Sequence, residues 1–164
     1  MGQPITGEYG HDSGLMVNET ATRARAGILN FISGITIVLL LTAPSLDPVI
    51  YVGPFVIFDM LVASIFGLTP LSPTGIIGTA TTLKAKPAWK PNKPKRFAWT
   101  LGASMGVMCL MLRLLHVDVV FIVAVLGTCF VLTLLESVFG FCVGCFMYSK
   151  LFKCKECAAT SSRK

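Results

Sequence analysis

Four long apolar stretches dominate the chain, and shorter polar segments separate them. An α-helix needs about 20 mostly apolar residues to cross the hydrocarbon core of a membrane, and each stretch approaches or exceeds that length. The pattern therefore predicts an all-α protein, an integral membrane four-helix bundle. The expected spans cover about residues 26–43, 48–68, 97–115 and 118–148. The last is longer than one crossing requires, so we expect it to tilt or to leave the lipid at its end.

The connections between the spans predict how the helices are ordered. Residues 44–47 and 116–117 form connections so short that the helices they join must run antiparallel. The middle connection, 69–96, is long, basic and rich in proline, which opposes a regular helix, although its first part could form a short amphipathic piece. We therefore expect two antiparallel transmembrane hairpins, preceded by a polar N-terminal tail (1–25) and followed by a basic, Cys-containing tail (153–164).

The charged residues predict an orientation in the membrane. They make up 13% of the chain, about half their share in soluble domains. With four spans, every lysine and arginine except Arg113 falls on one side. Positive residues mark the cytoplasmic side, so we expect a multi-pass protein of the inner (cell) membrane with both termini in the cytoplasm. Topology and contact with anionic lipid account for the net charge of +6, and no nucleic-acid partner is expected.

Ionisable residues within the spans are costly in lipid and need partners. Arg113 lies close to the outer end of its span, where it can snorkel outward and meet Asp47 or Asp118. Glu136 lies near the inner face, at the depth of Arg96, which predicts an interhelical ion pair between these two residues. These charges are interpreted as structural.

Asp59 differs from the other charges because no partner is evident at its depth in the second span. It is the best candidate for a buried functional carboxylate, and it is the only feature that favours a transporter. A neutral or hydrogen-bonded structural aspartate fits the position at least as well.

Two C-x-x-C pairs near the C-terminus carry the candidate chemistry: Cys142 with Cys145 in "GFCVGC", and Cys154 with Cys157 in "KCKEC". In a continuous helix the first pair shares one face, with Glu136 on the opposite side, where it is a poor base for either thiol. The basic surroundings of the second pair favour thiolate. The first pair is the candidate redox pair and the second supplies secondary thiols. They could cycle between dithiol and disulfide, or carry sulfur as persulfide.

A shared metal site is the alternative for these four cysteines. Zinc favours tetrahedral thiolate ligands, but a helix through the eight intervening residues would hold the two pairs about 13 Å apart. One zinc would require the helix to unwind around Lys150. We therefore rank zinc below the redox interpretation and predict no metal or cofactor. The remaining cysteines, Cys109 and Cys129, are interpreted as small apolar packing residues.

Glycines at G-x-x-x-G spacing predict close helix packing. They form two pairs, Gly102 with Gly106 and Gly140 with Gly144. Such faces suit a homo-oligomer or a non-catalytic accessory subunit that packs on a larger membrane complex. This hypothesis carries about the same weight as a thiol function, so whether the protein is an enzyme stays open.

Four motifs together resemble a small prokaryotic membrane family, domain of unknown function 4395. They are "ATRARAGILNF" before the first span, "LSPTG" after the second, "KPKRFAWTLG" entering the third and "ESVFGFCVGCFMY" ending the fourth. The resemblance implies four helices with a C-x-x-C at the inner end of the last, but no established activity. Relatives linked with thioredoxin-like or sulfur-handling partners point to thiol chemistry.

Overall fold

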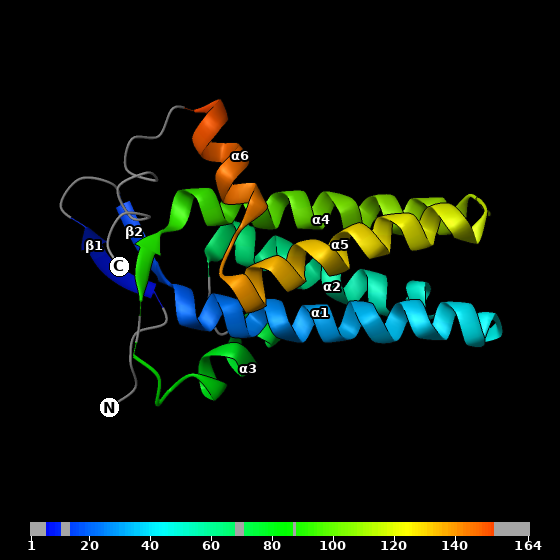
Figure 1. Ribbon diagram of the computed structural model, residues 1–164, viewed down its shortest axis with the longest axis horizontal. Coiled ribbons are helices and arrows are strands. Elements are labelled where there is room, and N and C mark those ends of the chain that lie inside the picture. The colour runs from blue at the N-terminus through cyan, green and yellow to red at the C-terminus, as the bar shows by residue number, and fades with distance from the viewer. Residues whose placement is uncertain (1–5, 11–13, 68–70, 87, 153–164) are drawn as a thin grey trace.

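The computed structural model describes residues 6–10, 14–67, 71–86 and 88–152, and four long helices make up most of it (Figure 1). Each of the four is long and apolar enough to cross a membrane. The predicted all-α bundle of four such helices is confirmed. The helices are α1 (Glu19–Thr42), α2 (Pro48–Phe66), α4 (Asn92–Leu114) and α5 (Val119–Phe139).

The closest helix pairs form between the two hairpins rather than within them. The short helix η1 (Pro44–Leu46) joins α1 to α2, and a short turn joins α4 to α5. Yet α2 packs most extensively on α4, and α1 packs on α5. Gly102 and Gly106 allow the close contact of α4 with α2. An added Cβ would lie 3.3 Å from the side chain of Met60 at Gly102, and 3.0 Å from that of Ile57 at Gly106. These two glycines therefore serve packing inside the chain.

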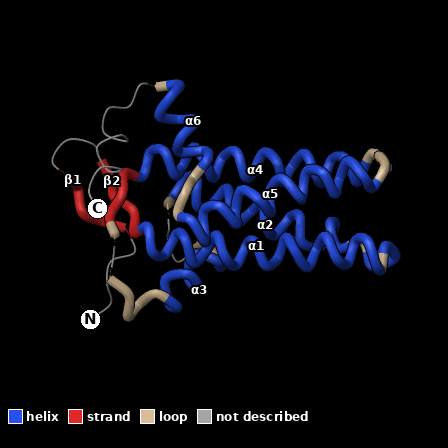
Figure 2. Tube along the Cα trace, in the orientation of Figure 1, coloured by secondary structure: helices blue, strands red, loops and turns tan. Residues whose placement is uncertain are grey.

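A small antiparallel sheet covers one end of the bundle (Figure 2). Its strands, in the order β1 (Thr6–Gly10), β2 (Gly14–Asn18) and β3 (Trp89–Pro91), come from segments far apart in the sequence. We call this end the sheet end. The short helices α3 (Pro73–Thr81) and α6 (Val143–Leu151) lie near it, whereas η1 lies at the opposite end, the turn end (Figure 1).

The structure corrects the boundary of the predicted polar N-terminal tail, residues 1–25, because β1, β2 and the start of α1 lie within it. Helix α1 begins at Glu19, because the side chain of Asn18 caps it by accepting a hydrogen bond from the Thr20 N–H at 3.0 Å. Its first turns are polar because they make ion pairs at the sheet end, so the apolar pattern starts a full two turns late. In the middle connection, α3 matches the expected short amphipathic piece.

The predicted fourth span is also corrected, because it is not one continuous helix to residue 148. Helix α5 ends at Phe139, and Gly140 adopts a left-handed conformation with φ of 66°. The N–H of Gly140 donates to the carbonyl of Glu136, and that of Phe141 to the carbonyl of Leu135, both at 3.1 Å. A left-handed glycine of this kind ends a helix, and α6 then continues in a different direction (Figure 1).

The break gives Gly140 and Gly144 separate roles, so they do not form the predicted G-x-x-x-G step. Gly140 supplies the turn, beside Arg23, whose guanidinium donates to the carbonyl of Val138 at 2.8 Å and so caps α5. Gly144 lies in α6 against α4, where an added Cβ would come within 2.6 Å of the Cβ of Ala98. This contact anchors α6 on the bundle.

Large apolar side chains are exposed over the outside of the bundle. On α5 alone, Phe121 is 58% exposed, Val131 52% and Val138 57%. So extensive an apolar surface is unusual for a soluble monomer, and it fits contact with lipid along the four helices. Most of the buried apolar residues form two clusters, Val17, Ala21, Leu29, Met60, Ala63, Trp99 and Ala103 in one and Leu40, Val49, Cys109 and Ile122 in the other.

Candidate thiol site at the sheet end

The break after α5 places Cys142 at the start of α6 rather than on a helix face. Cys142 is the N-cap residue, with extended backbone, and its Sγ accepts a hydrogen bond from the N–H of Cys145 at 3.4 Å. The N-terminal end of a helix carries partial positive charge, which favours an anion there. The sequence alone suggested two cysteines on one face of a continuous helix, whereas the structure gives them different positions and different surroundings.

A buried lysine lies near this pair. The Nζ of Lys95, on α4, is 2.6 Å from a carboxylate oxygen of Glu136 on α5 and 3.1 Å from one of Glu19 on α1. The side chain of Lys95 is only 2% exposed. The three residues tie three of the long helices together, and the charges of Lys95 and Glu136 act on Cys142.

The predicted pair between Glu136 and Arg96 is therefore wrong. The partner of Glu136 lies at the expected depth, but it is Lys95, the residue before Arg96. Side chains of neighbouring residues on a helix point about 100° apart. Lys95 faces the inside of the bundle, whereas Arg96 is exposed and donates to the Ile65 carbonyl at 2.8 Å, near the end of α2.

These surroundings make the two thiols unequal. The pKa of Cys142 is lowered, first because the thiol of Cys145 donates to its sulfur, and further by the Lys95 ammonium and the Cys145 backbone N–H. Burial and the Glu136 carboxylate oppose this effect without reversing it. The pKa of Cys145 is raised, mainly by the hydrogen bond it donates to Cys142 and then by burial. The arrangement favours a thiolate on Cys142 and a proton on Cys145.

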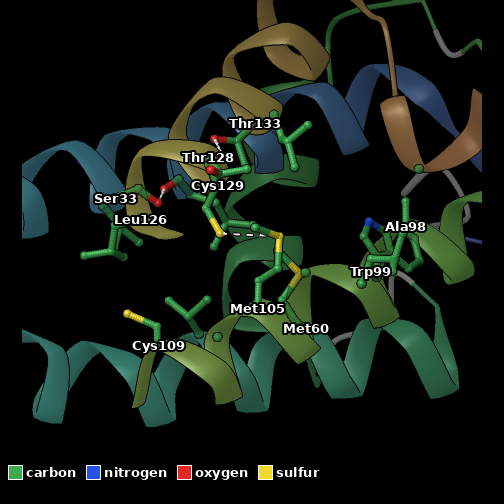
Figure 3. Close-up of a pocket in the computed structure, with 18 of the residues that line it drawn as sticks. Ser33, Met60, Ala98, Trp99, Met105, Cys109, Leu126, Thr128, Cys129 and Thr133 are labelled. Carbon is green, nitrogen blue, oxygen red and sulfur yellow. Dashed lines mark hydrogen bonds between the residues drawn. The ribbon is translucent and has the colours of Figure 1, made fainter. Parts of the chain in front are cut away.

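An apolar cavity of about 330 Å³ adjoins the site (Figure 3). All four long helices and α6 line it, and both Glu136 and Cys142 belong to its wall. The break thus places Glu136 beside the same space as Cys142, contrary to the expectation that it faces away from the thiols. Cys109 and Cys129 line the cavity farther along. Cys109 is buried among apolar side chains, as predicted for a packing residue.

Asp59 belongs to a separate buried cluster and has the partner that its sequence position did not reveal. An oxygen of its carboxylate lies 2.7 Å from the guanidinium of Arg25, on α1. The other oxygen accepts a hydrogen bond from the Ser72 hydroxyl at 2.7 Å and from the Thr74 N–H at 3.1 Å. Asp59 is completely buried. With both oxygens engaged, Asp59 joins α1, α2 and α3.

Arg113 makes the contact expected from its depth. Its Nε donates to the two carboxylate oxygens of Asp47, at 2.7 and 2.9 Å. The pair lies at the turn end, where it joins α4 to the residue before α2. Asp118, the other partner considered, is not used in this contact.

The four-cysteine zinc site can be assessed only for its first pair. Cys154 and Cys157 lie outside the described residues, as does the basic tail 153–164. Within residues 6–10, 14–67, 71–86 and 88–152, no group of three or more His, Cys, Asp or Glu side chains is placed to hold a metal ion. Helix α6 continues through Lys150 to Leu151.

Comparison with known proteins identifies a family but no activity. A family model described as "Domain of unknown function (DUF4395)" matches residues 17–153, most of the chain. This is the family that the four sequence motifs resemble. No curated protein matches the chain, and no solved structure matches it.

Proposed function

Because the chain belongs to this family, whose description states no activity, we propose a function from the geometry: a membrane thiol–disulfide protein in which Cys142 attacks and Cys145 resolves. The observation that carries the proposal is the position of Cys142 as N-cap of α6, where its sulfur accepts from the N–H of Cys145 and the Lys95 charge acts on it. C-x-x-C thiols at helix N-termini near a cation are typical of reactive cysteines.

The chemistry follows from thiol–disulfide exchange. The Cys142 thiolate attacks one sulfur of a partner disulfide, a new S–S bond forms, and the other partner sulfur leaves as thiolate. Cys145 then loses its proton and attacks the Sγ of Cys142, which releases the second partner sulfur. Two electrons pass from the C-x-x-C pair to the partner, and the pair ends as a disulfide. The reverse sequence reduces the pair.

The same site could instead transfer sulfur. The Cys142 thiolate would attack the outer sulfur of a partner persulfide and keep it as Cys142–S–SH, while the partner leaves as a thiolate. Cys145 would then release that sulfur as sulfide by forming the disulfide. Both versions need a thiol-bearing partner, such as a thioredoxin-like or sulfur-handling protein, and Cys154 and Cys157 are proposed as secondary thiols that exchange with it.

We propose that the four long helices cross the inner membrane with the sheet end in the cytoplasm. The distribution of charge supports this orientation: the lysines and arginines of the described residues lie toward the sheet end, except for Arg113 (Figure 1). Cys142 and Cys145 then lie at the cytoplasmic interface, where resting thiols are reduced.

A non-catalytic accessory subunit, or a homo-oligomer, is the second candidate, favoured by the exposed apolar face of α5. Gly127 lies in that helix with open space around it. A bulky residue there would disturb a protein partner but leave the chain's own packing intact. Gly102 and Gly144 do not offer this test, because they contact other helices of the same chain.

Trapping of mixed disulfides tests the proposed function. In cells, Cys145→Ser should accumulate a covalent complex with the partner, because Cys142 can attack but the intermediate is not resolved. Cys142→Ser, the matched control, should accumulate none. The complexes are counted by non-reducing electrophoresis and mass spectrometry. Equal trapping in both variants, or in neither, would contradict a thiol function. If Gly127→Leu abolishes the function of the protein in cells and neither cysteine variant does, the accessory subunit is supported instead.

A further inference from the structure

We propose that the cavity beside Cys142 binds an isoprenoid quinone, and that this quinone oxidises the Cys142–Cys145 dithiol to the disulfide. The proposal rests on the thiol function proposed above and adds the electron acceptor. It is carried by the composition of the cavity wall, by the tryptophan in that wall, and by the position of Cys142.

The cavity suits an apolar ligand of small size. Its volume of about 330 Å³ is at the lower end of the range for small-molecule pockets, about 300–1,000 Å³. Leucine, isoleucine, valine, methionine and glycine provide most of the wall. The cavity lies among helices suited to a membrane, so its ligand is expected to enter from lipid. A water-soluble disulfide or nucleotide cofactor does not fit these surroundings.

Trp99 supplies a hydrogen-bond donor inside this apolar wall. Its side chain is 96% buried, since only 4% is exposed, and it lines the cavity. Figure 3 draws no hydrogen bond from its indole nitrogen to the other residues shown. A buried indole N–H normally finds a partner. A ligand with a carbonyl oxygen on an apolar ring would satisfy it, and a quinone has this combination.

The two cysteines have the relation to the cavity that this reaction needs. Cys142 belongs to the wall, whereas Cys145 is not one of the lining residues. The backbone N–H of Cys145 donates to the Sγ of Cys142 at 3.4 Å, which holds the two residues together at the start of α6. A bound ring can therefore meet Cys142 while Cys145 approaches the same sulfur from α6.

The proposed step balances in atoms and electrons. The Cys142 thiolate adds to a ring carbon, a C–S bond forms, and the displaced electron pair moves to a carbonyl oxygen of the ring. Cys145 then loses its proton and attacks the Sγ of Cys142. An S–S bond forms, the C–S bond breaks, and its electron pair stays on the ring. The ring takes up two protons, one from Cys145 and one from water at the sheet end, and leaves as quinol.

The chain offers a matched pair of variants for a binding test, because it contains only two tryptophans, Trp89 and Trp99. Trp89 lies in β3, outside the cavity wall. A short-chain ubiquinone analogue is added to the full chain in lipid nanodiscs, and tryptophan fluorescence is recorded. Trp89→Phe keeps the cavity tryptophan and should show saturable quenching. Trp99→Phe keeps only the tryptophan of the sheet and should show weak quenching that does not saturate.

Both measurements are repeated with Cys142→Ser/Cys145→Ser, which should still bind the quinone, so binding is tested independently of the thiol function. Quinol formation by the reduced protein is followed from ultraviolet absorbance. It should require Cys142, and Trp99→Phe should raise the quinone concentration for half-maximal rate about fivefold to tenfold, as expected for one lost hydrogen bond. Trp89→Phe should leave it unchanged.

Three results would overturn the proposal. The first is equal, non-saturable quenching in both tryptophan variants. The proposed thiol function would then still be judged separately, by the trapping of mixed disulfides. The second is saturable binding without quinol formation by the reduced protein. The third is equally tight binding of an isoprenoid alcohol of the same tail length, which would make the cavity a general lipid pocket.

Discussion

The sulfur of Cys142 accepts a hydrogen bond from the backbone N–H of Cys145 across 3.4 Å, so the first cysteine of the C-x-x-C motif caps the helix that contains the second. This relationship depends on the break after α5. With a continuous helix, the N–H of Cys145 would bond to a backbone carbonyl one turn earlier. The left-handed turn at Gly140 frees the N–H and gives the two thiols different chemical roles.

The reactivity of Cys142 should depend on the donor at position 145. Cys145→Ala removes the hydrogen bond from the side chain, which is the main cause of the lowered pKa of Cys142, so that pKa should rise. At a pH below the pKa of a thiol, each unit by which that pKa rises reduces the thiolate fraction about tenfold. Alkylation of Cys142 by iodoacetamide at pH 7, followed by peptide mass spectrometry, should therefore slow by about that factor for each unit.

Cys145→Ser is the matched control, because its hydroxyl can still donate to Cys142. Its alkylation rate at pH 7 should stay above that of Cys145→Ala. The same rate in both variants would show that the side chain at 145 does not stabilise the thiolate.

Glu136→Gln should increase the reactivity of Cys142 at acidic pH. The groups that influence this thiol are Lys95, Glu136 and Cys145, and Glu19 adds a second carboxylate on Lys95. Glu136 raises the pKa of Cys142, so removal of its charge should lower that pKa. Alkylation measured from pH 5 to 8 should then persist to lower pH than in the unmodified protein. A profile displaced toward higher pH would be inconsistent with the described charges.

Gly140→Ala should destabilise the protein and slow the reaction of Cys142. A residue with a Cβ pays about 1–2 kcal/mol in the left-handed conformation, and a shift of the backbone to avoid this cost would move Cys142 away from the N-cap position. Unfolding in mixed micelles measures the first effect and alkylation the second. Gly127→Ala, in the open part of α5, is the control and should be neutral or slightly stabilising. Equal behaviour of both variants would indicate that the turn at 140 is not required.

Removal of one member of the buried pair Arg25–Asp59 should cost about 3–5 kcal/mol, because the other charge is left without a partner. Arg25→Met and Asp59→Leu are each expected to fall in this range. The double variant should lose much less than the sum of the two single losses. Free energies of unfolding in mixed micelles check this cycle. Additive losses would mean that the two charges do not stabilise each other.

The sequence was sufficient for features that depend on length, hydropathy and depth. The four long apolar helices, their short connections and the contact of Arg113 with Asp47 follow from such one-dimensional quantities. The ion pairs at the sheet end do not follow from length, hydropathy and depth. Lys95 and Arg96 have nearly the same depth along the helix, and only the directions of their side chains differ. Arg25 was assigned to a tail outside the spans, so Asp59 was left without a partner.

The C-x-x-C motif was identified from the sequence, but its geometry was not. Gly140 lies within a run of apolar residues, and a glycine in such a run reads equally well as a packing position or as the end of a helix. Its left-handed conformation decides between them, and the helix that follows, α6, packs on α4 at Gly144. The small sheet was missed because its strands are only three to five residues long.

The most direct test of the central claim is a redox titration of the Cys142–Cys145 pair in the purified full chain. The protein is equilibrated in glutathione buffers of graded potential, its free thiols are alkylated, and the peptide that contains both cysteines is weighed. The thiol function predicts that both labels disappear together, in one two-electron transition with a midpoint between about −270 and −120 mV, the range of thiol oxidoreductases. Two labels retained at every potential, or independent loss of one, would contradict it.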